Sequence, residues 1–281
     1  MQKLPVFGII GQAYAFVWQQ RNKFWALAVP AIIIVAIFTA ILVSAISLFG
    51  DPADLEISSL FGAEATFSEL IWAVAAWLAY LLVYIAVFVM YSVAWHRVFL
   101  APENVTMIRD AYGWHRRQTR FLFAYAKVLG LLFLILFVPI VFAVILGGMA
   151  SIVFNLLTVP TVIGMFWLYA RLSILFPAIA VDNNLTIKGA YSFTEKNGWR
   201  LFWIVALIAI SVSIVSQPIY FGLAIALDQF SGLGPLTANL ILSLVNAFFG
   251  FIAIVVFVSA LSISYSRLYA HTDVAIVERF D

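Results

Sequence analysis

Six long apolar runs limit the possible folds of this chain more than any other feature of its sequence. A helix needs roughly 20 apolar residues to cross a hydrocarbon core of about 30 Å, and every run approaches or exceeds that length. The runs cover residues 24–49, 68–96, 121–146, 150–169, 201–227 and 239–266. Only 10% of the residues are charged, whereas soluble domains carry roughly a quarter. We therefore predict an all-α, polytopic integral membrane protein with six transmembrane helices in a single membrane domain, residues 1–281.

The basic residues are confined to the two ends of the chain and to alternate connections between the runs, which lie on one side of the membrane if every run crosses it. All 15 Lys and Arg residues lie before the first run, after the last run, or in and around the second and fourth connections. The other three connections, residues 50–67, 147–149 and 228–238, contain none. Because Lys and Arg are enriched in cytoplasmic loops, the pattern predicts a multi-pass protein with both termini in the cytoplasm.

The segments before the first, third and fifth runs have a different character. Residues 6–20, 105–118 and 185–197 mix aromatic residues with polar or basic ones, which is typical of helices that lie in the headgroup plane. Each contains Ala-Tyr-x-aromatic, at residues 13–16, 111–114 and 190–193. We expect three cytoplasmic interfacial helices and a threefold internal repeat, with units 6–97, 104–171 and 185–267. Chance repetition in such an aromatic chain is the alternative.

Motifs of enzymatic chemistry are missing from the sequence. It has no cysteine, no nucleophile elbow, no H-E-x-x-H and no phosphate-binding glycine loop. His96, His115 and His271 fall at the predicted cytoplasmic side, where interfacial histidines are ordinary. No carboxylate or lysine lies near the middle of a predicted span, which counts against a proton-coupled transporter. We expect no catalytic, cofactor or metal site, no enzymatic activity and no nucleic-acid partner.

Two helix faces have alternative interpretations. Aromatic residues recur at three- and four-residue steps in the second span, so they share one face. We favour helix packing or lipid contact for this face over a surface for a flat or long apolar ligand. One face of the sixth span carries small and weakly polar residues, which allow close helix approach, so we expect it to turn into the bundle. The two sets are Trp77, Tyr80, Tyr84, Phe88, Tyr91 and Trp95, and Asn239, Ser243, Asn246, Gly250, Ala253, Ala260, Ser264 and Arg267.

The fourth connection resembles a known family. Arg171, then Pro177, then Gly-Ala-Tyr-Ser-Phe at 189–193 and Gly198-Trp199 are similar to the signature connection of a bacterial six-span group. That group includes the membrane domain attached to some glycerophosphodiester phosphodiesterases and the YciC-like inner-membrane proteins. The resemblance implies six spans and a location in the bacterial cytoplasmic (inner) membrane, and it implies little about activity.

A basic and aromatic belt at the cytoplasmic ends of the spans carries the functional interpretation. Juxtamembrane Lys and Arg gain about 1 kcal/mol each from anionic lipid. We expect a non-enzymatic protein that binds anionic lipid headgroups, or an accessory or scaffold subunit that contacts other membrane proteins. The alternative is a transporter or permease subunit for lipid or a small molecule. The candidate residues of the belt are Arg97, Arg116, Arg117, Arg120, Arg171, Lys188, Tyr191, Phe193, Lys196, Trp199, Arg200 and Arg267.

Overall fold

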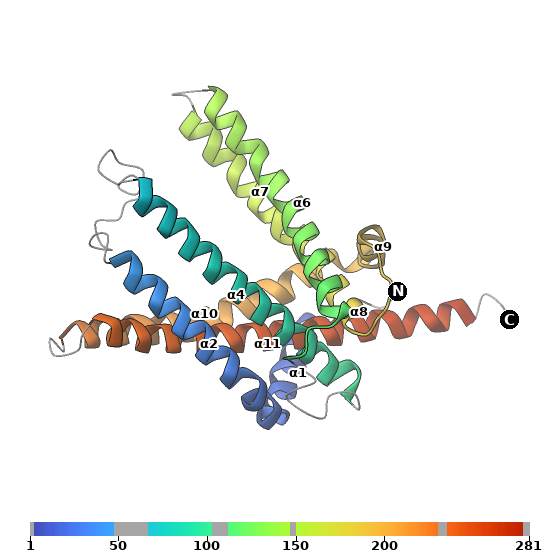
Figure 1. The fold of residues 1–281 in the computed structure, drawn as a ribbon. Helices are drawn as coiled ribbons and strands as arrows, with labels where there is room; N and C mark the ends of the chain where they lie inside the picture. The colour runs from blue at the N-terminus through green and yellow to red at the C-terminus, as the bar shows by residue number, and fades with distance from the viewer. Residues whose placement is uncertain (1–2, 48–66, 103–111, 147–149, 230–234, 278–281) are drawn as a thin grey trace. The chain divides into compact units, whose positions relative to one another are not determined.

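The structure is a computed structural model that describes residues 3–47, 67–102, 112–146, 150–229 and 235–277. These residues form helices joined by short turns, with no strand among them (Figure 1). In chain order the helices are α1 (Val6–Gln19), α2 (Arg21–Ser47), α4 (Phe67–Leu100), α6 (Arg116–Leu146), α7 (Ala150–Leu172), α8 (Leu175–Ala180), α9 (Ile187–Phe193), the 3-10 turn η3 (Glu195–Asn197), α10 (Gly198–Gln229) and α11 (Pro235–Val277).

Six stretches of the described helices are long and apolar enough to cross a membrane. They lie in α2, α4, α6, α7 with α8, η3 with α10, and α11, and each overlaps one of the predicted runs. For the described residues, the prediction of an all-helical chain with six helices able to span a membrane is therefore confirmed. The helices extend beyond the apolar runs; α6, for example, begins at Arg116, five residues before its apolar part.

The predicted interfacial helices are matched only in part by secondary structure. α1 coincides with the first of them, and α9 with η3 occupies the third. Half of the second, residues 105–118, lies outside the described residues; in the described half, residues 113–115 are not helical and residues 116–118 already belong to α6. Placement in the headgroup plane and the threefold repeat both stay predictions.

A short buried helix follows α7 after a turn of two residues. Helix α7 ends at Leu172, one residue after Arg171, and α8 then begins at Leu175. Pro177 falls in the first turn of α8, where its missing N–H costs nothing. The end of α8 is closed by Asp182 N–H to Ile179 O and Asn183 N–H to Ala178 O, 3.1 and 2.9 Å, the two bonds of a Schellman motif.

Asp182 takes the left-handed position of this motif. Its φ is 62°, a conformation that glycine usually supplies and that Asp tolerates better than most side chains. Because this position is an aspartate and not a glycine, the turn after α8 carries a carboxylate side chain.

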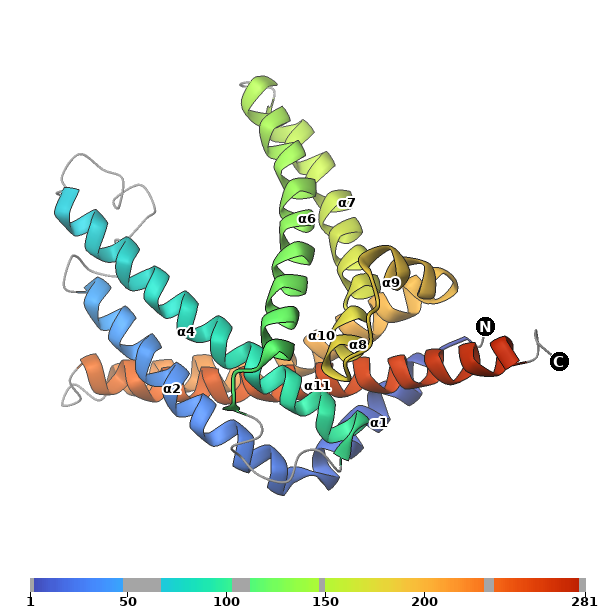
Figure 2. The ribbon, with the colours of Figure 1, turned by 45° about the vertical axis from the view of Figure 1, so that its right-hand side comes forward.

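The chain packs as two compact units. The first contains Met1–Arg21, Ser92–Ala209 and Val255–Asp281, and the second contains Asn22–Tyr91 and Ile210–Ile254. In the first unit α6 and α7 run side by side as a hairpin, with α8 and α9 near its base (Figure 2). The unbroken buried stretch 170–180 forms much of its core.

Polar side chains hold the core of the first unit together. Trp95 Nε1 donates to Ser259 Oγ at 2.7 Å, and Asn183 Nδ2 donates to Tyr265 Oη at 2.9 Å. His96 Nδ1 lies 2.8 Å from Ser262 Oγ, whose own proton goes to Val258 O, so His96 donates from Nδ1. Such interhelical bonds are a common means of joining helices in a membrane.

The second unit is joined by aromatic contacts. Trp25 of α2 stacks on Phe248 of α11 at 5.9 Å between ring centroids, and Tyr91 of α4 meets Phe251 edge to face at 4.9 Å. The C-terminal part of the aromatic stripe on the second span, around Tyr91, thus packs between helices, as predicted. Toward the N-terminal end of the stripe the rings are more exposed, reaching 53% at Trp77.

The small, weakly polar face of the sixth span behaves differently in its two halves. Ala260 and Ser264 are fully buried in the first unit, which confirms the expected orientation there. Asn246 and Gly250 are exposed in the second unit, where they line a hollow together with residues of α2 and α4, so they face these helices without being buried. The difference follows the packing, because in the first unit Trp95 and His96 pack against the serines of α11.

Candidate functional site

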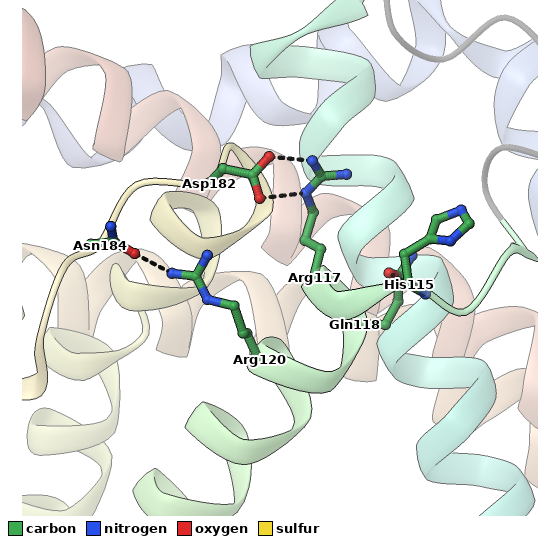
Figure 3. A network of polar contacts seen from close by, with 6 residues as sticks. All are labelled: His115, Arg117, Gln118, Arg120, Asp182 and Asn184. Carbon is green, nitrogen blue, oxygen red and sulfur yellow. Dashed lines mark hydrogen bonds and ion pairs between the residues drawn. The ribbon is translucent and has the colours of Figure 1, made fainter.

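The start of α6 brings three of the predicted basic residues together. Arg116, Arg117 and Arg120 occupy its first two turns, before the apolar part of the helix. His115 precedes the helix, and its backbone N–H donates to the Gln118 side chain at 3.1 Å, which caps the first turn (Figure 3). The helix dipole disfavours cations at a helix N-terminus, so it does not explain why the three arginines lie there.

Two of these arginines reach the segment that follows α8. Arg117 makes a two-point contact with the Asp182 carboxylate, with 3.1 Å between Nε and Oδ1. Arg120 Nη2 donates to Asn184 Oδ1 at 2.5 Å. Figure 3 shows both contacts side by side. The hydrogen bond from Arg117 lowers the pKa of Asp182, and the charges of Arg117, Arg97 and Arg120 act in the same direction, so Asp182 is ionised at neutral pH.

A polar hollow of 380 Å³ lies among these side chains; it is lined by Arg116, Arg117, Arg120, Asp182 and Asn184. Its lining carries three positive charges and one negative charge. Asp182 is paired with Arg117 and Asn184 is neutral, so the described lining holds no further carboxylate for Arg116 and Arg120. The hollow can therefore accept an anion.

A second hollow continues from Arg120 along α6, and we call it the basic groove. It has a volume of 610 Å³ and is lined by Arg120, Phe123, Ala124, Lys127, Leu175, Ile179, Leu185, Thr186, Ile187 and Lys188. The four α6 residues lie three, four and seven positions from the first of them, Arg120, so they share one helix face. They extend over about 10 Å of helix. Three cations and no carboxylate line a wall that is otherwise mainly apolar.

The opposite side of the groove is set by α8 and the start of α9. Leu175 and Ile179 are one helical turn apart on α8 and are buried. Thr186 caps α9 by accepting a hydrogen bond from Gly189 N–H at 3.0 Å, which fixes Ile187 and Lys188 in the first turn. The groove is therefore built from segments about 60 residues apart in sequence.

Arg171 belongs to a different cluster, which we call the arginine clamp. Its side chain is only 3% exposed. Its guanidinium donates to Tyr191 O at 2.5 Å and to Thr194 Oγ1 at 3.2 Å, and it lies over the rings of Tyr191 and Trp167, 3.5 and 4.8 Å from their centroids. This arginine ties the end of α7 to α9, and both its Nε and its Nη2 donate within the protein.

The other residues of the predicted belt are spread over the first unit. Arg200 Nη1 donates to Leu4 O at 2.6 Å, and Arg267 Nη2 donates to Gln12 Oε1 at 2.9 Å, so both fasten the N-terminal segment. Phe193 lies against Tyr265 at 6.4 Å between centroids. Arg97 is half-buried, while Lys196 and Trp199 are exposed. Of the twelve belt residues, the two hollows bring together only Arg116, Arg117, Arg120 and Lys188.

Several lining residues were absent from the sequence-based list. Asp182 and Asn184 could have been found from position, since they follow Pro177 in a basic connection. Lys127 follows Arg120 by seven residues, about two turns of helix, so the spacing places both on the same face. Leu175 and Ile179 gave no signal, because their role depends on long-range packing. Among the described residues, no group of three His, Asp or Glu side chains could hold a metal ion.

No protein-family model, curated protein or solved structure matches this chain. The resemblance to the bacterial six-span group therefore stays a prediction, and the site is interpreted from its own geometry.

Proposed function

We propose that this chain is a non-enzymatic protein of the bacterial cytoplasmic membrane that binds anionic phospholipid at the basic groove and the adjoining polar hollow. Both termini are then cytoplasmic, and the site faces the inner leaflet. An accessory role in a membrane complex would use the same lipid contact.

The observation that carries this proposal is the shared position of Arg120. It lines both the polar hollow and the basic groove. A phospholipid has the same two parts, an anionic phosphate and an apolar chain, at a fixed separation. Arg116 and Arg120 suit the phosphate because guanidinium groups bind phosphate oxygens bidentately. Phe123, Leu175 and Ile179 suit the upper part of an acyl chain.

Lys127 and Lys188 add two further cations to the basic groove. Lys127 lies about 10 Å further along α6 than Arg120, and its long side chain can reach back toward the headgroups. Lys188 stands across the groove, in the first turn of α9. Cations on both sides favour a headgroup with net negative charge over a zwitterionic one.

The test compares two double variants of the full-length protein that lose the same charge. Arg120→Gln with Lys188→Gln changes the groove. Arg21→Gln with Lys196→Gln changes two exposed basic residues outside it. The readout is native mass spectrometry after release from nanodiscs that contain equal amounts of phosphatidylglycerol and phosphatidylcholine.

The unmodified protein should retain phosphatidylglycerol preferentially. Two cations at about 1 kcal/mol each predict a loss of about thirtyfold in the groove variant, and less than about threefold in the control. Equal losses in both variants would show a diffuse basic surface, and no loss in either would refute the lipid site.

A further inference from the structure

A small hollow in the second unit has no role in the proposed function. It has a volume of 240 Å³ and lies between α2, α4 and α11. Its lining includes Thr39, Tyr80, Tyr84, Ser243, Asn246 and Gly250. No charged side chain is among its lining residues. Drug-sized sites have volumes of about 300–1,000 Å³, so this hollow suits a smaller group.

Two polar side chains of α11 are available in this hollow. Ser243 is only 7% exposed, and Asn246 is exposed. Within the described part of the chain neither side chain makes a hydrogen bond. Thr39 differs, because its Oγ1 already donates to Val35 O at 2.8 Å.

The depth of the hollow in the membrane raises the free-energy cost of leaving these polar groups without hydrogen bonds. Thr39 lies 16 residues after Lys23 on α2, about 24 Å along the helix. With a hydrocarbon core of about 30 Å, the hollow then lies within the far half of the membrane from Lys23. An amide without a partner in such surroundings is costly, so a ligand that satisfies it gains the full value of the bond.

We infer that this hollow binds an uncharged, hydroxyl-bearing group, such as the sugar of a neutral glycolipid or a free sugar of the same size. Hydroxyls can donate to the Asn246 carbonyl and accept from its amide N–H, and they can do the same with Ser243. The rings of Tyr80 and Tyr84, 6.0 Å apart between centroids, offer apolar walls for the C–H face of a saturated ring. The lack of charge in the lining disfavours an ionic headgroup.

The first pair of test variants fills space. A Cβ built on Gly250 meets nothing within 4 Å, and the same holds for Gly222 on α10. Gly250→Leu therefore fills the hollow without a backbone clash, while Gly222→Leu adds the same side chain in the second unit at a residue that does not line it.

The second pair removes an amide and keeps the volume similar. Asn246→Leu takes the polar group out of the hollow, and Gln217→Leu removes an exposed amide of α10 outside it. This pair keeps the test decisive if Gly250→Leu fails to fold.

The full-length protein is placed in phosphatidylcholine nanodiscs with and without glucosyl-dioleoylglycerol, and retained lipid is measured by native mass spectrometry. We expect retention of the glycolipid over phosphatidylcholine, a loss of about five- to tenfold with Asn246→Leu, a loss of at least about tenfold with Gly250→Leu, and little change with Gly222→Leu or Gln217→Leu. Competition by free glucose would identify a soluble sugar as the ligand. Retention without competition would identify a membrane-anchored one.

Three results would overturn the inference. One is equal retention of glycolipid and phosphatidylcholine by the unmodified protein. Another is equal behaviour of the hollow variants and their controls. The third is a change of oligomeric mass in Asn246→Leu with unchanged lipid retention, which would show that the amide pairs with a second copy of the chain.

Discussion

Gly198 begins α10 directly against Arg171, and adding one methyl group there tests how firmly the arginine clamp is held. A Cβ on Gly198 would lie 3.0 Å from Arg171 Cδ and 3.1 Å from Trp167 Nε1. Contacts this short require the neighbours to move. Arg171 cannot move freely, because two hydrogen bonds and two aromatic rings fix its guanidinium.

The expected cost follows from two opposing effects. Overpacking a well-packed core costs about 1–3 kcal/mol, while replacing a helical glycine with alanine gains about 0.5–1 kcal/mol. We therefore expect Gly198→Ala to lower the free energy of unfolding by up to about 2.5 kcal/mol. Gly164→Ala in α7 is the control, since its Cβ meets nothing within 4 Å, and it should be neutral or stabilising.

The assay is thermal unfolding of both variants in the same detergent, followed by the fluorescence of the nine tryptophans. The midpoint of Gly198→Ala should fall below that of the unmodified protein, and the midpoint of Gly164→Ala should stay at or above it. In an Arg171→Ala background the penalty of Gly198→Ala should become smaller, because the contacts with the Arg171 side chain are gone and only the one with Trp167 Nε1 remains. A Gly198→Ala midpoint at or above that of the unmodified protein would refute the tight packing of the clamp.

Two further predictions concern the first unit. Trp95→Phe removes the hydrogen bond from Nε1 to Ser259 Oγ and should lower the free energy of unfolding by about 1–2 kcal/mol. The control, Trp77→Phe at a 53% exposed position, should change it very little. Equal effects of the two variants would contradict the buried role of Trp95. The lowered pKa of Asp182 means that its carboxylate stabilises the fold above its ordinary pKa of 3.8 and that this stabilisation is lost as the pH falls through the lowered value. Asp182→Asn, which also tolerates the left-handed backbone, should therefore unfold at a lower temperature than the unmodified protein at neutral pH, and the difference should vanish at acid pH; a difference independent of pH would contradict the ion pair.

The spans could be predicted from the sequence because each reports a local property. Twenty apolar residues need a helix whatever surrounds them, and the observed helices overlap every predicted run. The end of α7 near Arg171 was also predictable, since Pro177 stands only a few residues later. Capping signals were local too, as Thr186 before α9 illustrates.

The site was only partly predictable, because it depends on which surfaces meet. Counting basic residues grouped Arg171 with Arg116 and Arg120, yet the structure buries Arg171 under two rings and leaves Arg116 exposed. The face formed by Arg120, Phe123, Ala124 and Lys127 is visible in the sequence as a spacing. Its meaning appears only when α8 and the start of α9 pack across it.

The most direct measurement of the central claim is a map of where anionic lipid touches the protein. The full-length protein is reconstituted with a phosphatidylglycerol analogue that carries a photoactivatable group near the glycerol, irradiated, digested and analysed by peptide mass spectrometry. The account predicts crosslinks concentrated in residues 120–127 and 185–188, reduced by the Arg120→Gln, Lys188→Gln double variant, and weaker with a matching phosphatidylcholine analogue. Crosslinks spread evenly over the spans, or equal labelling by the two lipids at these residues, would contradict an anionic lipid site in the basic groove.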